Sequence, residues 1–196
     1  MKQQMDRTPA LERFPPVMLH SILTAVRRFE PDLYVHICRR HHLDADRILG
    51  LFGELEMLGP GQLTQVLADL RAHTSYDQIM RLAGRNTLVE YAALHNLTLN
   101  TASENKLRTA IGELLPVFSG KAAITLISRG NVLFLEMFDS VFARGISDAR
   151  TLCGFYCGLL AELGASGSGM PREVTESRCR ASNHDTDSCQ FQIGLG

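Results

Sequence analysis

Apolar residues recur every three or four positions through the first half of the chain, which is the spacing of amphipathic helices. One such helix is expected to open at Pro31, because proline is favoured at the first helical position. The pattern predicts a helical section over residues 1–100, which we expect could serve as a dimer surface. The expected helices are residues 17–29, 31–43, 47–58 and 61–73, with one or two more over residues 75–97.

The spacing changes in the second half of the chain. Residues 103–118 are still helical in pattern, and Ser103 is a fair N-cap. Residues 121–128 and 131–138 are instead rich in β-branched and aromatic side chains, and they flank a short turn at Gly130. This stretch predicts a β-hairpin.

A second helix and hairpin follow. Helical spacing returns over residues 148–163, and we expect that helix to end at Gly164, before a flexible glycine-rich turn. Residues 172–181 and 188–195 alternate between apolar and polar side chains around the polar loop 182–187. These residues predict a second hairpin at the end of the chain.

The order of these elements indicates an α+β fold. We expect the helical section, residues 1–100, to be followed by a helix and antiparallel-hairpin domain over residues 101–196. The two sections are expected to pack as one compact unit.

Composition and charge narrow the class of protein. The chain has 196 residues, 45% of them hydrophobic, which is enough for one sizeable core. Lys and Arg number 20 against 21 Asp and Glu, and no block of like charge predicts direct nucleic-acid binding. The apolar runs are far shorter than the roughly 20 residues of a membrane-spanning helix. The first residues contain no apolar secretory signal, so we expect a cytoplasmic protein.

Cysteine and glutamate residues near the C-terminus are the main candidates for chemistry. Thiols stay reduced in the cytosol, where clustered cysteines are more often metal ligands or redox groups. A set of thiolates with one carboxylate suits zinc, which accepts tetrahedral sulfur, nitrogen and oxygen donors. The candidate ligands are Cys153, Glu176, Cys179 and Cys189, with His184 and Cys157 in reserve.

The spacing leaves three readings of these residues open. Glu176 and Cys179 are three positions apart, so a regular strand would point them to opposite faces. Joint binding of a metal would therefore need a β-bulge or a strand end between them. The thiols could instead be small core residues, or Cys179 and Cys189 could form a cross-strand thiol–disulfide switch.

Several residues of the second half resemble the 4-vinyl reductase domain family. A cysteine followed by an aromatic pair and a glycine precedes an E-x-x-C hairpin with a second cysteine and a phenylalanine. The resemblance covers about residues 120–195, and the longer loop 182–187, with Asn183 where the family has glycine, departs from it. The matching residues are Cys153, Phe155, Tyr156, Gly158, Glu176, Cys179, Ala181, Cys189 and Phe191.

The resemblance implies a fold, a metal and a ligand. The family's fold is similar to that of TRAPP subunits and encloses an apolar cavity, and in its phenol sensors cysteines and a glutamate hold a structural zinc. By position, that zinc would be bound here by Cys153, Glu176, Cys179 and Cys189. The cavity would be lined by Phe134, Met137, Phe138, Phe142, Phe155, Tyr156 and Leu159.

The expected function is a non-catalytic carrier or sensor for a large apolar molecule. A tetrapyrrole intermediate of bacteriochlorophyll synthesis is the first expectation, and an aromatic or lipid-like molecule is the next. A vinyl reductase is the alternative, but the chain has no nucleotide, flavin or iron–sulfur motif to supply electrons. We also expect a homodimer. No axial ligand for a tetrapyrrole metal is assigned among His41, His42 and His95.

Overall fold

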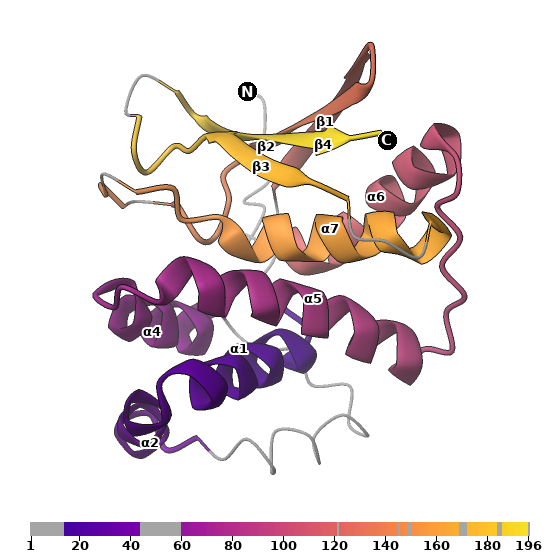
Figure 1. Ribbon diagram of the computed structural model, residues 1–196. Helices are drawn as coiled ribbons and strands as arrows, with labels where there is room; N and C mark the ends of the chain where they lie inside the picture. The colour runs from indigo at the N-terminus through magenta and orange to yellow at the C-terminus, as the bar shows by residue number, and fades with distance from the viewer. Residues whose placement is uncertain are drawn as a thin grey trace, which may run out of the picture.

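The chain forms a four-stranded sheet with helices stacked in layers on one of its faces (Figure 1). The computed structural model describes residues 14–43, 60–120, 122–144, 146–148, 150–168, 172–183 and 186–195. The helix expected over residues 47–58 lies outside the described residues, as does His184.

Four helices in the described residues of the first half form the layers farthest from the sheet (Figure 1). They are α1 (Pro16–Phe29), α2 (Pro31–Arg40), α4 (Pro60–Arg71) and α5 (Tyr76–Leu94). Helices α1 and α2 each begin at a proline, and for α2 the sequence pattern predicted this start. The apolar side of α1 packs against α5, so its predicted hydrophobic face is its buried face.

The second half supplies two helices and the whole sheet. Helix α6 (Glu104–Ser119) begins after Ser103, whose hydroxyl accepts a hydrogen bond from the Lys106 N–H at 3.4 Å. The predicted cap is therefore confirmed. The remaining elements are β1 (Ala123–Arg129), β2 (Val132–Phe138), α7 (Gly154–Ser168), β3 (Val174–Arg178) and β4 (Ser188–Gly194).

The two predicted hairpins join into one antiparallel sheet in the order β1-β2-β4-β3. Side chains alternate across it, so that Leu135 of β2 and Phe191 of β4 are buried partners on the inner face. Helix α7 lies against this inner face (Figure 1). The α+β class is confirmed. The division of the chain at residue 100 stays a prediction. Helix α5 of the first section packs closely on α7 of the second.

Helix α7 differs from its expected bounds at both ends. It begins at Gly154 instead of residue 148, and it continues through Gly164 and Gly167 to Ser168 instead of ending at Gly164. The continuation has a packing reason, because a Cβ at Gly167 would lie 2.2 Å from the Ala102 backbone nitrogen. Gly167 lets the end of α7 approach the chain before α6, and both glycines lie in the helix instead of a turn.

The backbones of α5 and α7 come into direct contact at two glycines. A Cβ at Gly84 would lie 1.9 Å from the Phe155 carbonyl oxygen, and a Cβ at Gly158 would lie 1.9 Å from the Arg81 carbonyl oxygen. Because no side chain separates them, the two helices pack more closely than ordinary side-chain packing permits. In the part of the chain that is described, no helix is long and apolar enough to cross a membrane.

Gly158→Ala is expected to lower the free energy of unfolding by about 1–3 kcal/mol or more, because the added methyl meets a backbone carbonyl that cannot move independently. Urea denaturation followed by circular dichroism measures the effect. Gly112→Ala in α6 is the control, since nothing lies within 4 Å of its Cβ position. There, alanine should stabilise the helix by up to about 1 kcal/mol. Equal effects of the two substitutions would contradict the close approach.

Candidate metal centre

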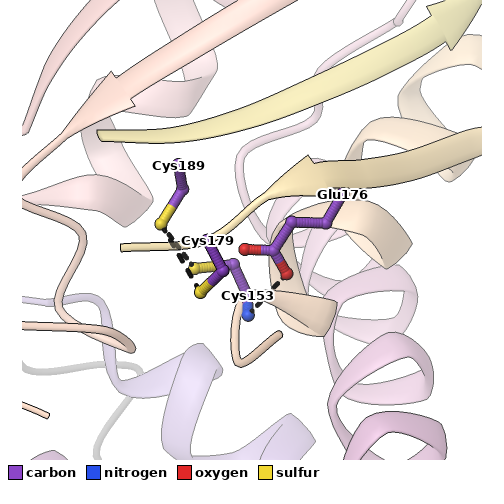
Figure 2. Close-up of side chains that lie close together, drawn as sticks. All are labelled: Cys153, Glu176, Cys179 and Cys189. Atoms are coloured by element: carbon purple, nitrogen blue, oxygen red, sulfur yellow. Dashed lines mark hydrogen bonds between the residues drawn. The ribbon is translucent and has the colours of Figure 1, made fainter. Parts of the chain in front are cut away.

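Four side chains that lie far apart in the sequence converge where α7 meets the sheet (Figure 2). They are Cys153, Glu176, Cys179 and Cys189, and their ligand atoms all lie within 4.8 Å of one another. The three thiols are each no more than 1% exposed, and the glutamate is partly buried. The structure therefore brings together the four residues that the sequence singled out, whereas metal binding by them stays a prediction.

The distances between the sulfur atoms suit a shared tetrahedral ion. The Sγ atoms of Cys153 and Cys189 are 3.4 Å apart, and those of Cys189 and Cys179 are 3.8 Å apart. Two thiolates that bind one zinc at about 2.3 Å in tetrahedral geometry lie about 3.8 Å apart. All five cysteines are free thiols in this structure, so the spacing does not come from a disulfide.

An irregularity in β3 puts Glu176 and Cys179 at the same site. Glu176 pairs with Phe191 of β4, and Arg178 then pairs with the next residue, Gln190, so Ser177 is an extra residue in β3. This β-bulge changes the alternation of side chains along the strand. A β-bulge or a strand end between Glu176 and Cys179 was what the sequence analysis required for both residues to bind one metal.

Backbone N–H groups orient the ligand atoms. The Cys153 N–H, just before α7, donates to Glu176 Oε2 at 3.0 Å. The Leu152 N–H donates to the Cys179 sulfur and the Arg180 N–H to the Cys189 sulfur, each at 3.4 Å. Each of these donors favours a negatively charged acceptor, as at a metal thiolate.

Two side chains that the sequence analysis did not identify support the cluster from outside. The Ser140 hydroxyl lies 3.3 Å from the Cys153 sulfur, and the buried Tyr76 hydroxyl donates to the Leu152 carbonyl at 3.1 Å. Tyr76 opens α5, so this bond ties the segment before α7 to another helix. Neither residue has a sequence pattern that points to this role, because the contacts are long-range.

Burial and proximity determine the charge that the cluster can hold without a cation. Burial, together with the neighbouring Cys179, raises the pKa of Glu176 to about 9. Burial also raises the pKa of Cys153 well above its ordinary value. Hydrogen bonds from the Cys153 and Cys189 thiols lower the pKa of Cys179. One negative charge is therefore favoured among these groups, and a bound cation would favour further deprotonation.

The Glu176 carboxylate also has an oxygen without a partner. Its Oε1 is buried and makes no hydrogen bond, although a buried polar atom normally has a partner. A cation among the sulfur atoms would supply that partner. The chemistry of the donors and this orphan oxygen together fit a bound metal ion.

The reserve ligand Cys157 lies outside the cluster. It is buried one turn further along α7, and burial raises its pKa to about 12. It is not among the four residues whose ligand atoms meet. Cys157 is therefore placed as a small core residue.

The residues expected to line one cavity are divided between the two faces of the sheet. Met137 is fully buried on the inner face, whereas Phe134 and Phe138 alternate with it along β2 and point outward. The other expected lining residues, Phe142, Phe155, Tyr156 and Leu159, are fully buried. The seven residues cannot surround a single pocket, because neighbouring positions of a strand face opposite sides.

The buried rings among them contact each other. Phe142 stacks on Phe155 with ring centroids 5.0 Å apart, and Tyr156 meets both rings edge to face. These contacts fill the interior between α7 and the segment that follows β2. The aromatic positions that we expected to surround a cavity therefore form part of the core.

Two of the unassigned histidines have structural partners. His41 Nε2 lies 2.8 Å from Asp69 Oδ2, and this contact connects the end of α2 to α4. The ring centroids of His95 and Tyr91 are 4.2 Å apart. His42 has a positive φ of 52° at the turn after α2. A further histidine, His20, bonds Glu90 at 2.8 Å and joins α1 to α5.

The fold is similar to that of H-NOX proteins. No protein-family model matches this chain, and no curated protein does either. The H-NOX protein from S. oneidensis in its Fe(II)NO ligation state is 13% identical, covers 93% of this chain and 99% of its own, and has a TM-score of 0.58. A mutant of the Fe(II) unliganded H-NOX protein from K. algicida is 14% identical, with coverages of 92% and 96% and a TM-score of 0.62.

A second kind of sensory protein shares part of the fold. The phenol-responsive sensory domain of the transcription activator PoxR, solved with phenol, is 16% identical and has a TM-score of 0.51. It covers 71% of this chain, and the match spans 77% of that domain. At these identities the comparisons establish a common fold.

The family assigned from the sequence is corrected by these findings. The chain was expected to belong to the 4-vinyl reductase domain family, with a TRAPP-subunit-like fold. That assignment is wrong, because the similar structures are H-NOX proteins and a phenol-responsive domain, and H-NOX proteins match more than nine-tenths of the chain. A motif confined to the second half could not detect a likeness that includes the helical first half.

Tyr76→Phe is expected to lower the free energy of unfolding by about 1–3 kcal/mol, because it leaves the buried Leu152 carbonyl without its hydroxyl donor. Thermal and urea unfolding measure the change. Tyr91→Phe is the matched control, since Tyr91 is only partly buried and contacts its neighbours through its ring. A Tyr76→Phe protein as stable as the control would show that this bond does not support the cluster.

Proposed function

We propose that this chain is a non-catalytic sensory domain that binds a small apolar molecule and holds a structural zinc ion. The observation that carries the metal proposal is the convergence of three thiols and one carboxylate within 4.8 Å. Cys153, Glu176, Cys179 and Cys189 are the proposed ligands.

Zinc is the metal that these donors favour. Sulfur-rich tetrahedral sites select zinc over calcium and magnesium, which prefer oxygen ligands. Glu176 Oε1 is the oxygen available for the fourth position, since Oε2 already accepts from the Cys153 N–H. Four protein ligands leave no open coordination position, which is typical of structural zinc sites.

The proposed ion would fasten three segments together. Cys153 precedes α7, Glu176 and Cys179 belong to β3 and the residue after it, and Cys189 lies in β4. Their bonds to one ion would hold the last hairpin against the beginning of α7. The free energy of zinc binding would then contribute directly to folding of this part of the chain.

The small-molecule part of the proposal is supported by the shared fold. H-NOX proteins solved in Fe(II) ligation states and a phenol-responsive domain solved with phenol have this architecture. A tetrapyrrole, the first expectation from the sequence, is not the ligand that the interior favours. Phe142 stacks on Phe155 at the start of α7, and Tyr156 meets both rings edge to face, so a large planar ligand bound among them would have to displace all three.

A single-ring aromatic molecule is therefore the ligand class that we propose. Such a molecule could take the place of one ring contact with a small shift of the others, and its edges and faces would meet aromatic side chains favourably. The proposal assigns no catalytic residue. It also assigns no histidine to a bound iron, since His20 and His41 are tied to Glu90 and Asp69.

Freshly purified protein is expected to contain about one zinc per chain by elemental analysis. Cys189→Ala should lose most of that zinc and unfold at a lower temperature, because one of the proposed ligands is gone. Cys157→Ala is the matched control: it removes an equally buried thiol from outside the cluster and should retain the metal. Zinc that stays bound when Cys153, Cys179 and Cys189 are all replaced would refute the site.

Phenol is expected to raise the melting temperature of the zinc-loaded protein. At phenol concentrations above the dissociation constant, the rise should follow the logarithm of the concentration. Cyclohexanol, similar in size but without an aromatic ring, is the control and should act more weakly. A strong visible absorption band in the purified protein would contradict this ligand class and restore the tetrapyrrole. No shift with phenol or other single-ring aromatics would overturn the ligand proposal while leaving the zinc measurement intact.

A further inference from the structure

The outer face of the sheet carries apolar side chains that the described residues leave uncovered. Helix α7 covers the inner face, and no described helix lies over the outer one (Figure 1). Ile127 on β1 is 46% exposed and Phe138 on β2 is 37% exposed, and Phe134 is only partly buried. Large apolar side chains gathered on one face commonly mark an interaction surface.

An apolar pair spans β1 and β2 on this face. Ile127 and Phe134 are direct cross-strand partners in the register of β1 and β2. They border a shallow groove of about 160 Å³, to which Arg129 and Glu136 also contribute. The groove is therefore apolar in the middle and charged at its ends.

The two charges are placed symmetrically about that pair. Arg129 lies two residues from Ile127 in one direction along the strands, and its guanidinium carbon is 5.8 Å from the centre of the Phe134 ring. Glu136 lies two residues from Phe134 in the opposite direction, level with Thr125. The opposite charges thus lie two residues along the strands on either side of the apolar pair.

We propose that this face binds a second copy of the same chain. The two sheets would face each other, with a two-fold axis between them that runs perpendicular to the strands. At the level of Ile127 and Phe134, this axis would place the apolar pair of one chain against the same pair of the other. The same rotation would bring Arg129 of each copy to the level of Glu136 of the other. Such self-complementarity is what a two-fold interface requires, and it would form two reciprocal ion pairs at the ends of the contact.

Contact through the face is favoured over pairing along the edge of β1. β1 is an edge strand, but Arg108 of α6 donates to its Leu126 carbonyl at 3.3 Å and to the Ser128 hydroxyl at 2.8 Å. An acceptor that a second strand would need is therefore occupied. The outer face has no comparable cover in the described part of the chain.

The size of the face predicts a weak dimer. Strands of seven residues are about 23 Å long, and four strands are about 19 Å wide, so the face covers on the order of 450 Å². A standard interface buries roughly 800 Å² on each partner. The dimer should therefore form and dissociate with concentration, and it needs neither the metal nor the small ligand.

Sedimentation velocity across a hundredfold range of concentration tests this surface. The wild-type chain should shift from a species of 21.7 kDa toward one of twice that mass as the concentration rises. Ile127→Lys should raise the dissociation constant at least tenfold, because the axis brings two lysines together. Val89→Lys is the control, since Val89 is a similarly exposed apolar residue, on α5 and away from the sheet; it should leave the mass unchanged.

A charge exchange tests the proposed arrangement of the two copies. Arg129→Glu alone and Glu136→Arg alone should each weaken the dimer several-fold, and the double variant should recover most of the affinity because the ion pairs form again with reversed signs. Circular dichroism verifies that each variant folds, as Glu136 also bonds Ser188 and Gln190 within its own chain. A wild-type chain that stays monomeric throughout, a dimer indifferent to Ile127→Lys, or a double variant no better than the singles would each overturn the proposal.

Discussion

The backbones of α5 and α7 touch directly, and the arrangement of the elements around the donor cluster follows from this contact. Gly84 and Gly158 each occupy a place where a side-chain carbon would overlap a carbonyl of the other helix. The contact determines how deeply α7 lies between the sheet and the outer helices (Figure 1). It thereby determines where Cys153, the residue just before α7, meets β3 and β4 (Figure 2).

The cluster of donors follows from that position combined with the register of the last hairpin. Pairing of β3 with β4 places Cys189 beside the end of β3, and the bulge at Ser177 directs Glu176 and Cys179 toward the same point. Without a cation, deprotonation of Cys153 and Glu176 at this buried site is unfavourable, as their raised pKa values indicate. A zinc ion would stabilise the deprotonated groups and connect the hairpin to the segment before α7.

The shared fold and the interior side chains bear on different parts of the proposed function. H-NOX proteins share the architecture along almost the whole chain. In the interior of this chain, Phe142 stacks on Phe155, and Tyr156 meets both rings edge to face. The likeness therefore establishes the fold, and the small-molecule ligand stays a proposal.

Local sequence patterns were enough to predict the α+β class, both hairpins, most helices and the four candidate ligands, because each leaves a mark in spacing or residue type. They did not predict the end of α7: its glycines resemble a turn until the close contact of Gly167 with the distant Thr101 and Ala102 is known. They placed Phe134, Phe138 and Met137 in one pocket, although the alternation of β2 separates them. The family assignment was wrong, since a short motif carries little information about the path of the whole chain. The bulge, the support from Tyr76 and the meeting of the donors were decided by tertiary structure, because each depends on contacts between residues far apart in the sequence.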